Sequence, residues 1–482
     1  MKLIAYYLPQ FHEIEINNKA WGKGFTEWTN VKKALPLFEG HNQPRIPLND
    51  NYYNLLDVNI LIWQVSLAKK YGIHGFCYYH YWFQDGIQAL EKPAEILLEH
   101  KEIDFPFCFS WANEPWTRTW HGAKGEKEVL IEQRYGDRAE WKAHFDYLLP
   151  FFLDDRYIKI DEKPVLLIYQ INKIGCISKM LDYWNELAIE NGISGFYVID
   201  MLTADGKVCK NKRVSASADF EPGKDLRRIS AGGKKLSYDD ICCSMLWAAH
   251  KKNEYRCMFV DYDDTPRRNE KGTVFFGTSP EKFGKYLQKA IKLSEEEGNN
   301  ILFINAWNEW GEGNYLEPDT KNAYAYLEQV YAAKNEMCED VFANEVMIKD
   351  SIVKKNGDIE KYNKYYTLCN QWIKNINDHY SIETYFQEKG YQKIAIYGMG
   401  ELGNRLVESL IDSDIQIIYG IDRDTSIAFA EINIIGIDEV DKLEGVDCIV
   451  VTSIHVYEQI AEILKKKSNC DIISLEDVVF GL

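Results

Sequence analysis

The chain has 482 residues, which is long enough for one large domain and a smaller one, because single hydrophobic cores seldom extend beyond about 300 residues. Its apolar fraction of 46% and charged fraction of 27% are ordinary for a globular protein, and no uninterrupted apolar stretch reaches the roughly 20 residues of a membrane helix. The formal net charge of −18 argues against a nucleic-acid-binding surface, although it leaves room for one local basic pocket.

The N-terminus and the cysteines predict a cytoplasmic protein. The opening run, MKLIAYYLPQFHE, is not typical of a signal peptide, because Pro9 interrupts its apolar residues and no small-residue cleavage site follows. The 11 cysteines are odd in number and scattered, and no pair has the spacing of zinc ligands. We therefore expect reduced structural thiols and no metal centre.

Short apolar segments alternate with amphipathic helical patterns through residues 1–335. The helical pattern at 55–72 ends at Gly72, and Ser279-Pro280 begins another with a capping residue followed by proline. This alternation predicts parallel β/α units, and eight strands predict a (β/α)8 TIM-type barrel. The eight expected strands lie at residues 3–9, 72–82, 106–116, 164–170, 195–200, 215–222, 255–264 and 300–310.

Polar and aromatic residues cluster where four of these strands end. The clusters read YYHYW, SWANEPW, DYDDTPRR and NAWNEWGEG. Burying their Asn, His, Asp and Glu side chains beside aromatic rings without water would cost free energy, so packing alone explains four clusters poorly. Barrel chemistry takes place at the carboxyl ends of the strands, and we expect the site there.

The last cluster predicts a pair of reacting carboxyl groups. Glu309 and Glu312 are three residues apart, and on one helical turn their Cβ atoms would lie about 5–6 Å apart. When two carboxylates lie at such a short distance, their repulsion raises the pKa of one of them. That carboxyl group can then donate a proton. Trp307 and Trp310 flank them and could offer flat faces to a sugar. The pattern favours general acid/base work on a glycosidic bond.

Other strand ends supply candidate substrate-binding residues. No second ligand lies at metal spacing around His80, so a hydrogen-bonding histidine is expected there. Arg267 and Arg268 either bind a phosphate or pair with Asp263 and Asp264. The full set of candidate substrate-binding residues is Glu27, Trp28, Tyr79, His80, Trp82, Trp111, Asn113, Glu114, Tyr169, Arg267, Trp307, Asn308 and Trp310.

The remainder of the chain predicts a helical connector at 336–390 and a small Rossmann-like domain at 391–482. Gly398, Gly400 and Gly403 follow an apolar strand and open a helix, and a second strand ends at Asp422. In that context the glycines permit close approach of a pyrophosphate, and the acid can hold a ribose. A nucleotide or dinucleotide is therefore one interpretation, and a docking or oligomerisation module is the other.

Six motifs within residues 1–335 resemble those of a known family. They are AYYLPQFH, GFTEWTNV, GIHGFCYYHYW, FSWANEPWTRTW, DDTPRR and NAWNEWGEGNYLEPD. This part of the chain resembles the WbsX-type proteins of cell-surface polysaccharide gene clusters, which are related to glycoside hydrolase family 99. The hydrolases of that family are (β/α)8 endo-acting α-mannosidases that retain configuration without a metal.

The resemblance implies roles for the two carboxyl groups. Glu309 corresponds to the base that takes the proton of the sugar's own 2-hydroxyl, giving an epoxide-like intermediate, and Glu312 to the acid that later acts as base. The hydrolases read Glu-Trp-His-Glu at this point, whereas Gly311 stands here before Glu312. The match is better to the WbsX branch, whose members are often labelled glycosyltransferases.

We therefore expect a cytoplasmic, carbohydrate-active enzyme of cell-surface polysaccharide biosynthesis, such as that of O-antigen, lipopolysaccharide or capsule. It would act on a glycosidic linkage of the α-mannoside kind in an oligo- or polysaccharide. One alternative is a glycosyltransferase that uses a nucleotide-linked or lipid-phosphate sugar, held at Arg267. Another is a glycan-binding protein without catalysis.

Overall fold

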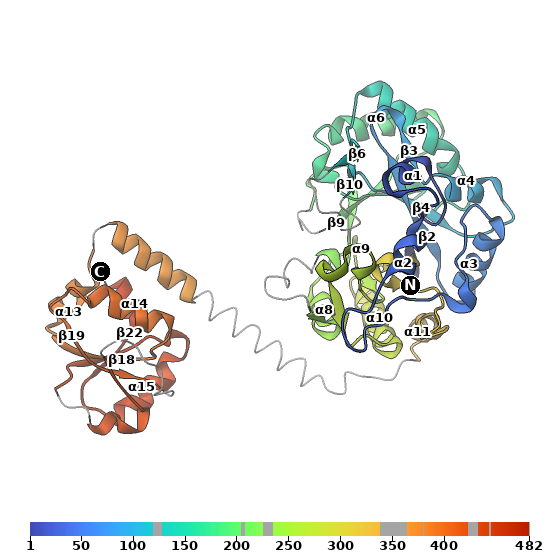
Figure 1. The fold of residues 1–482 in the computed structure, drawn as a ribbon. Helices are drawn as coiled ribbons and strands as arrows, with labels where there is room; N and C mark the ends of the chain where they lie inside the picture. Colours follow the sequence, from blue (N-terminus) through green and yellow to red (C-terminus); the bar gives the residue numbers. More distant parts are fainter. Residues whose placement is uncertain are drawn as a thin grey trace. The chain divides into compact units, whose positions relative to one another are not determined.

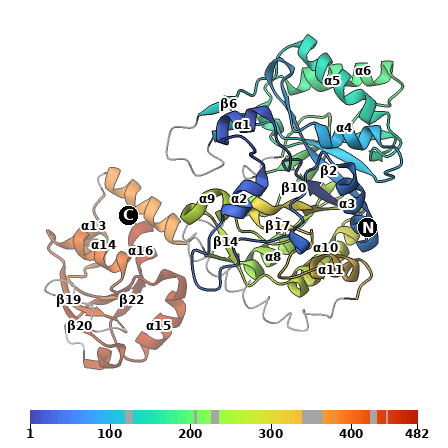
Figure 2. The ribbon, with the colours of Figure 1, turned by 45° about the vertical axis from the view of Figure 1, so that its right-hand side comes forward.

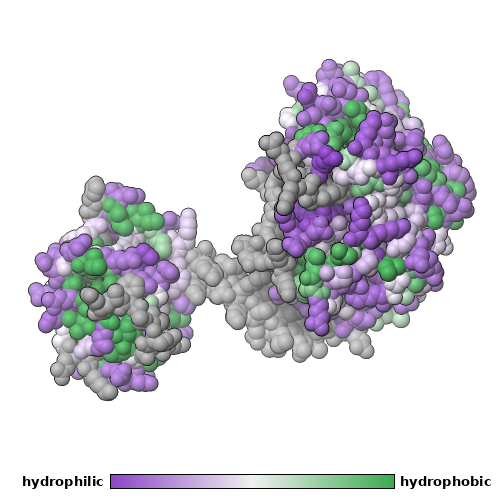
Figure 3. Space-filling model, viewed as in Figure 1, coloured by the Kyte–Doolittle hydropathy of each residue, from purple (hydrophilic) through white to green (hydrophobic). Residues whose placement is uncertain are grey.

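The computed structural model describes residues 1–118, 128–203, 208–224, 235–337, 364–378, 380–422, 432–442 and 445–481. The chain forms two compact units, Met1–Val341 and Phe342–Leu482 (Figure 1). None of the described helices has both the length and the apolar character needed to cross a bilayer. On the face of the first unit seen in Figure 3, hydrophilic side chains predominate and hydrophobic ones are scattered.

Eight parallel strands form a barrel in the first unit. Each pairs with the next along the chain, and the last pairs with the first in the register Ala5↔Ile304. The seventh strand closes the ring, because its first part, β12, pairs with β10 and its second part, β13, pairs with β15. The strands are β1 (Lys2–Tyr7), β2 (Gly75–Trp82), β4 (Phe107–Trp111), β8 (Lys163–Ile168), β9 (Tyr197–Leu202), β10 (Val214–Asp219), β12 (Glu254–Tyr255) with β13 (Cys257–Phe259), and β15 (Ile301–Asn305). The predicted (β/α)8 barrel is confirmed.

Helices follow most of the barrel strands and cover the outside of the barrel (Figure 1). Helices α5 and α6 lie side by side, as do α10 and α11 (Figures 1 and 2). The main helices are α3 (Val58–Tyr71), α4 (Lys92–Glu99), α5 (Arg138–Phe152), α6 (Ile177–Glu190), α8 (Tyr238–Trp247), α10 (Pro280–Glu296) and α11 (Ala325–Lys334). Shorter helices are α1 (Glu15–Trp21), α2 (Glu27–Lys33) and α9 (Thr265–Arg268), and short extra strands are β3 (Gln88–Ala89), β5 (Trp116–Thr117), β6 (Val129–Ile131), β7 (Lys159–Ile160), β11 (Lys235–Ser237) and β14 (Val274–Phe276).

Helix α10 illustrates how the sequence sets these elements. Ser279 caps its N-terminus by accepting a hydrogen bond from the Lys282 amide, and Pro280 occupies the first helical position. Its buried side chains include Phe283, Leu287 and Ile291, which recur every four residues along one face. That face packs against the sheet, and the helix begins where the sequence predicts it.

Aromatic rings fill the centre of the barrel. Tyr6 of β1 stacks on Phe303 of β15, with ring centroids 5.3 Å apart, and on Tyr79 of β2 at 5.9 Å. All three side chains are at most 8% exposed. Because the interior is a packed core, a ligand must enter from the end of the barrel.

The second unit contains a five-stranded parallel sheet in the order β20-β19-β18-β21-β22. Its first strand in the chain is central and the connections run outward on both sides, as in doubly wound folds. The strands are β18 (Lys393–Tyr397), β19 (Gln416–Ile421), β20 (Asn433–Ile435), β21 (Cys448–Val451) and β22 (Asp471–Ser474). The helices are α13 (Ile382–Lys389), α14 (Glu401–Leu410), α15 (Tyr457–Lys465) and α16 (Leu475–Phe480). The Rossmann-like class predicted for this region is confirmed.

The segment predicted as a connector contributes to the core of this unit. Residues 364–377 are helical, whereas 338–363 lie outside the described residues. Leu368 and Trp372 of this helix are buried together with Phe386 of α13 and Leu406 of α14. Most of the described connector therefore packs as part of the second unit.

Candidate active site

A cavity of about 220 Å³ lies at the carboxyl ends of the barrel strands. Parallel strands of a barrel all end on one face, which is why segments far apart in the sequence meet there. The lining residues are Leu8, Gln10, Glu27, Tyr79, Tyr81, Phe83, Ala112, Glu114, Pro115, Trp116, Tyr169, Phe220, Pro222, Gly223, Tyr262, Asn305, Glu309 and Glu312.

Three carboxylates converge on one guanidinium group at this cavity. Arg267 donates from Nη2 to Glu309 Oε2 over 2.9 Å and from Nη1 to Glu312 Oε1 over 2.5 Å. Its Nε donates to Glu27 Oε1 over 2.8 Å. The side chain of Arg267 is 4% exposed, that of Glu309 8% and that of Glu312 22%, so the contacts lie largely out of water. The two carboxyl groups predicted to react therefore lie together, and both reach the cavity.

Burial controls the protonation of this pair. Burial and the negative charge of Glu312 raise the pKa of Glu309 to about 8, against the opposing effect of Arg267. Burial likewise raises the pKa of Glu312. If Glu27, Glu309 and Glu312 were all ionised, the cluster that they form with Arg267 would have a net charge of −2. Such an uncompensated charge is unfavourable out of water. The pair therefore retains a proton near neutral pH.

A short hairpin carries the pair. Strand β16 (Asn308–Glu309) pairs with β17 (Asn314–Tyr315), and the 3-10 turn η6 (Trp310–Glu312) connects them. Asn308 ties this hairpin to the segment after β1, because its Oδ1 accepts from the Leu8 amide over 2.8 Å and its Nδ2 donates to the Leu8 carbonyl over 3.0 Å. Asn308 is fully buried, and in the ligand-free site its side chain holds the hairpin in place.

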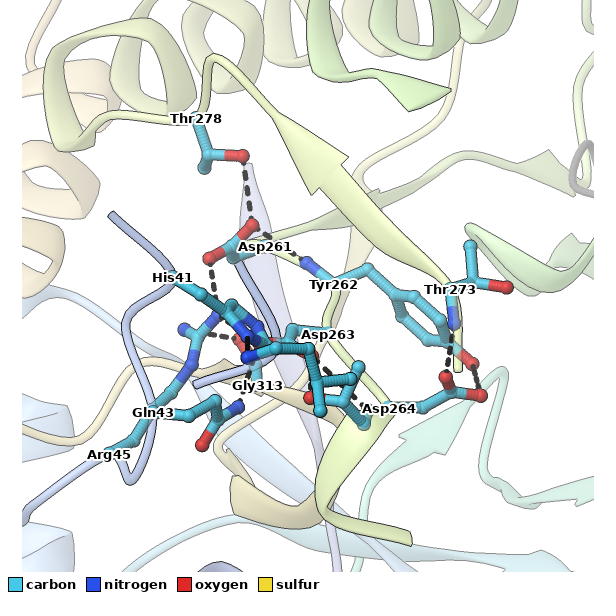
Figure 4. Close-up of polar contacts among 12 residues, drawn as sticks. His41, Gln43, Arg45, Asp261, Tyr262, Asp263, Asp264, Thr273, Thr278 and Gly313 are labelled. Carbon is cyan, nitrogen blue, oxygen red and sulfur yellow. Dashed lines mark hydrogen bonds and ion pairs between the residues drawn. The ribbon is translucent and has the colours of Figure 1, made fainter. Parts of the chain in front are cut away.

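Asp263 links the hairpin to the segment that follows β13 (Figure 4). Its backbone amide donates to the Glu312 carbonyl over 2.6 Å. Its Oδ2 accepts from Gln43 Nε2 over 2.7 Å and lies 2.9 Å from His41 Nε2. These contacts fix the main chain that carries Arg267 relative to the main chain that carries Glu312.

Arg45 provides a second link between the same segments (Figure 4). Its Nη2 donates to Asp261 Oδ2 over 2.9 Å, and its Nη1 donates to the Gly313 carbonyl over 3.0 Å. The segment around residues 41–45 thus holds the loop after β13 and the hairpin together. Such outer contacts keep reacting groups in a fixed geometry.

Arg267 does not offer a free cation to the cavity. It pairs with Glu27, Glu309 and Glu312 rather than with Asp263 or Asp264, and the neighbouring Arg268 contacts Asp264 at 3.3 Å. The described residues that line the cavity include no lysine or arginine. In the ligand-free site Arg267 belongs to the carboxylate cluster, and its contact with a substrate phosphate stays a prediction.

Three of the five tryptophans predicted to bind substrate, Trp28, Trp307 and Trp310, are part of the core. Trp307 is fully buried and packs on Phe76, with ring centroids 5.0 Å apart. Trp310 is 1% exposed and stacks on Tyr315 at 3.8 Å. Trp28 is 5% exposed and packs against Trp310 at 5.3 Å. None of the three lines the cavity.

Glu317 explains why the Trp310 ring lies on the inside. Its carboxylate accepts hydrogen bonds from Trp310 Nε1 over 2.7 Å, Tyr53 Oη over 2.8 Å and Gln64 Nε2 over 2.7 Å. Burial raises the pKa of Glu317 to about 7, and the three donors oppose that effect. This third acid of the motif is a structural anchor for the turn that carries Glu309 and Glu312.

Four further candidates lie in a separate buried cluster. His80 Nε2 is 2.8 Å from His144 Nε2, and burial lowers the pKa of His80 to about 3. Trp82 stacks on His144 at 4.5 Å, and Trp111 donates from Nε1 to the Trp82 carbonyl. Asn113 hydrogen-bonds to the main chain of residue 170 and to a tyrosine hydroxyl. None of these four side chains lines the cavity.

The structure brings Glu27, Tyr79, Glu114 and Tyr169 to the cavity as the sequence predicts, and adds residues that the sequence analysis missed. Every second residue along β2 and its extension faces the same side of the strand, and on one side these residues are Tyr79, Tyr81 and Phe83. His80 and Trp82 point to the other face. This period of two was present in the sequence and could have identified the inward set. The missed lining residues with chemistry or aromatic rings are Gln10, Tyr81, Phe83, Trp116, Phe220, Tyr262 and Asn305.

The described residues contain no cluster of three or more His, Cys, Asp and Glu side chains able to hold a metal ion. The ten cysteines within the described ranges are all free thiols.

The glycines of the second unit have distinct geometric requirements. Gly398 has a φ of +90°, and its amide donates to the Ile421 carbonyl over 2.9 Å. A Cβ on Gly403 would lie 2.3 Å from the Gly398 carbonyl oxygen, whereas a Cβ on Gly400 would meet nothing within 4 Å. Asp422 accepts from the Met399 amide over 2.8 Å, so its carboxylate braces the glycine turn. In nucleotide-binding loops of this kind, one glycine permits a tight turn, a second leaves space for a ligand to approach the backbone, and a third allows the helix to pack closely on the strand.

These differences predict unequal effects of two alanine substitutions. Gly403→Ala is expected to destabilise the second unit by about 1–3 kcal/mol, because the backbone must move to admit the methyl group. Gly400→Ala is the matched control and should change stability by less than about 0.5 kcal/mol. Thermal unfolding followed by circular dichroism measures both, and equal effects of the two substitutions would contradict this packing.

Comparisons with known proteins were made for both units. Residues 3–330 match the family model described as "Glycosyltransferase WbsX", and residues 390–472 match the model described as "C2185-like, N-terminal". Two Xanthomonas campestris pv. campestris proteins named "Uncharacterized protein WxcX" are 32% identical over 342 residues, which is 68% of this chain and 48% of theirs. The chain thus spans about half the length of these curated relatives. Among solved structures, an endo-alpha-mannosidase of glycoside hydrolase family 99 from Bacteroides thetaiotaomicron matches with 16% identity and a TM-score of 0.47 over 70% of this chain and 97% of that one.

Proposed function

Because the chain belongs to the WbsX glycosyltransferase family, we propose that its barrel is a carbohydrate-active enzyme that acts on a glycosidic linkage through Glu309 and Glu312. One observation carries this proposal: Arg267 holds both carboxylates at a cavity on the face of the barrel where chemistry takes place. The proposed setting is the biosynthesis of a cell-surface polysaccharide in the cytoplasm, and the proposed substrate is an oligo- or polysaccharide.

The proposed reaction retains the configuration of the sugar, in line with the resemblance described above. Glu309 takes the proton of the 2-hydroxyl while that oxygen attacks the anomeric carbon, and Glu312 gives a proton to the leaving oxygen. A water or an acceptor hydroxyl, deprotonated by Glu312, then opens the epoxide-like intermediate, and the 2-oxygen regains its proton from Glu309. Each carboxyl group ends in the protonation state in which it began.

In the proposed mechanism one proton lies on Glu309 before substrate binds and on Glu312 when the reaction begins. Glu309 is the more deeply buried of the two, so in the free site the shared proton stays on it. A substrate 2-hydroxyl that donates to Glu309 stabilises its ionised form, which moves the proton toward Glu312. Substrate binding therefore prepares the base and the acid in one step.

The charge at the cavity favours a neutral saccharide. The charged residues among the described lining are Glu27, Glu114, Glu309 and Glu312, and Arg267 is shared by three of them. A diphosphate would meet negative charge at this place. The aromatic side chains of Tyr81, Trp116 and other lining residues offer apolar faces to the C–H groups of a sugar ring.

Transfer to an acceptor is the second candidate outcome, and the name of the family favours it. The first half of the reaction is the same as in hydrolysis, and only the group that opens the intermediate differs. Release of free sugar indicates hydrolysis, whereas a longer glycan formed from two saccharides indicates transfer.

The proposed mechanism makes a prediction about substrates. The 2-hydroxyl must lie opposite the leaving group, as in α-mannosides. A 2-deoxy analogue lacks the oxygen that attacks the anomeric carbon, so it is expected to react at least about a hundredfold more slowly. Proton NMR of the first product should show the α-anomer. A first product with the β-configuration, or full activity toward the 2-deoxy analogue, would contradict the mechanism.

A further inference from the structure

Gly311 is glycine for reasons of space. It is not among the glycines with a positive φ, so its backbone conformation is open to any residue. A Cβ at this position would lie 1.8 Å from Glu27 Oε1 and 2.8 Å from Arg267 Nε. The carboxylate of Glu27 therefore occupies the volume that a side chain at position 311 would need. Both atoms belong to the contact between Glu27 and Arg267, which crosses directly over the turn between Glu309 and Glu312.

Glu27 is held firmly in that position. It is the first residue of helix α2, its amide donates to the Gln10 carbonyl over 3.0 Å, and its side chain is 1% exposed. Its Oε1 accepts from Arg267 Nε, while the two terminal nitrogens of Arg267 face Glu309 and Glu312. An anchored Nε fixes the plane of a guanidinium group, because the five donors form a rigid fork. Glu27 thus sets the direction in which Arg267 presents its other nitrogens.

Glu27 also contributes charge to the cluster. Its negative charge is one of the causes that raise the pKa of Glu309. Without it, the guanidinium of Arg267 would face two carboxylates instead of three. The net charge of the fully ionised cluster would then change from −2 to −1. Removing the charge of Glu27 therefore lowers the pKa of Glu309.

We propose that Glu27 is a positioning residue for the Glu309–Glu312 pair, that it acts through Arg267, and that Gly311 is glycine to leave room for it. This inference rests on the proposed function for its catalytic meaning. Its geometric part, the coupling of Glu27 with Gly311, stands on the packing alone. The absence of a histidine before Glu312 then has a physical reason: the acid from helix α2 fills its place.

A double-mutant cycle tests the geometric part without any activity assay. Gly311→Ala is expected to lower the melting temperature of the full chain by several degrees, because the methyl group expels the Glu27 carboxylate from its contact with Arg267. In a Glu27→Ala background the same substitution should lower the melting temperature clearly less, because the overlap with the Glu27 carboxylate is gone. Only the 2.8 Å approach to Arg267 Nε then remains, on a guanidinium that Glu27 no longer holds. An equal loss in both backgrounds would overturn the inference.

The pH dependence tests the positioning role. Glu27→Gln keeps the shape of the side chain and removes its charge, so the upper midpoint of the pH–rate profile is expected to fall by about one pH unit. The pH at which the melting temperature stops falling should move down with it, and that readout needs no turnover. Glu15→Gln is the control, because Glu15 is also in the first turn of a helix but is exposed, and it should move neither midpoint.

The two failures can be told apart. If the wild-type chain turns over no saccharide yet the cycle and the melting profile behave as expected, the proposed function fails and the coupling of Glu27 with Gly311 holds. If turnover is observed and Glu27→Gln leaves both midpoints unchanged, the positioning role is wrong while the proposed function stands.

Discussion

Replacing Glu309 with glutamine is expected to lower the turnover number about a thousandfold or more, and Glu312→Gln to do the same with a natural glycan, because each removes a group that moves a proton in the transition state. Glutamine preserves the shape of the side chain, and it removes the need to ionise a buried group. Thermal unfolding at neutral pH should therefore show no loss of stability in either variant.

The two variants separate the roles of the carboxyl groups. A substrate with an acidic leaving group, such as a nitrophenyl glycoside, needs little proton donation, so Glu312→Gln should recover most of the rate of the first step. Glu309→Gln should not, because attack by the 2-hydroxyl still requires a base. Substantial activity in both variants toward the natural glycan would defeat the assignment, and recovery by Glu309→Gln alone would exchange the roles.

Replacing Arg267 with methionine is expected to destabilise the first unit by about 3–5 kcal/mol, because it leaves buried carboxylates without their partner. Arg268→Met is the matched control: its side chain is 57% exposed, and its contact with Asp264 is long, so a change below about 0.5 kcal/mol is expected. Tryptophan fluorescence follows the first unit, since every tryptophan of the chain except Trp372 precedes residue 338.

The loss caused by Arg267→Met should grow with pH. The pKa of Glu309 is raised to about 8 in the folded chain, so stability is fully present below its ordinary unfolded value and declines as the pH rises toward about 8. Without the guanidinium the ionised carboxylates repel one another more strongly, and the decline becomes steeper and extends to higher pH. A destabilisation that is the same at about pH 5 and about pH 9 would contradict this electrostatic account.

The barrel could be predicted from the sequence because each of its strands is a short apolar run that ends in turn or cluster residues. Residues 255–264 were expected as one strand, and the structure divides them into β12 and β13, which is a local change within the same ring. The second unit was harder. Strands β20 and β22 are short and partly exposed, so their hydrophobic alternation is weak in the sequence.

The carboxylate pair could be predicted, but the roles of its aromatic neighbours could not. Trp307 and Trp310 lie within two residues of Glu309 in the sequence, and such proximity does not say whether a ring faces the cavity or the core. Trp310 turns inward because Glu317, seven residues away, accepts its Nε1 proton. The separation of two residues in the sequence does not predict such a contact. The alternation of residues in β2, in contrast, does identify Tyr79 and Tyr81 as the pair that faces inward.

The partner of Arg267 also depended on the tertiary structure. From the sequence, the nearby Asp263 and Asp264 were the expected acids, because local ion pairs are the simplest interpretation. The fold instead brings Glu27, from a helix near the N-terminus, and the closing hairpin to the same guanidinium. Because these acids lie far from Arg267 in the sequence, only the tertiary structure shows that its positive charge offsets their negative charge.

The most direct measurement is a crystal structure of the Glu309→Gln variant of the full chain with an α-mannosyl oligosaccharide bound. The account predicts a sugar ring in the cavity, with its 2-hydroxyl against the side chain at position 309 and its glycosidic oxygen within hydrogen-bond distance of Glu312. A saccharide bound away from both positions, or a sugar phosphate whose phosphate contacts Arg267, would contradict it.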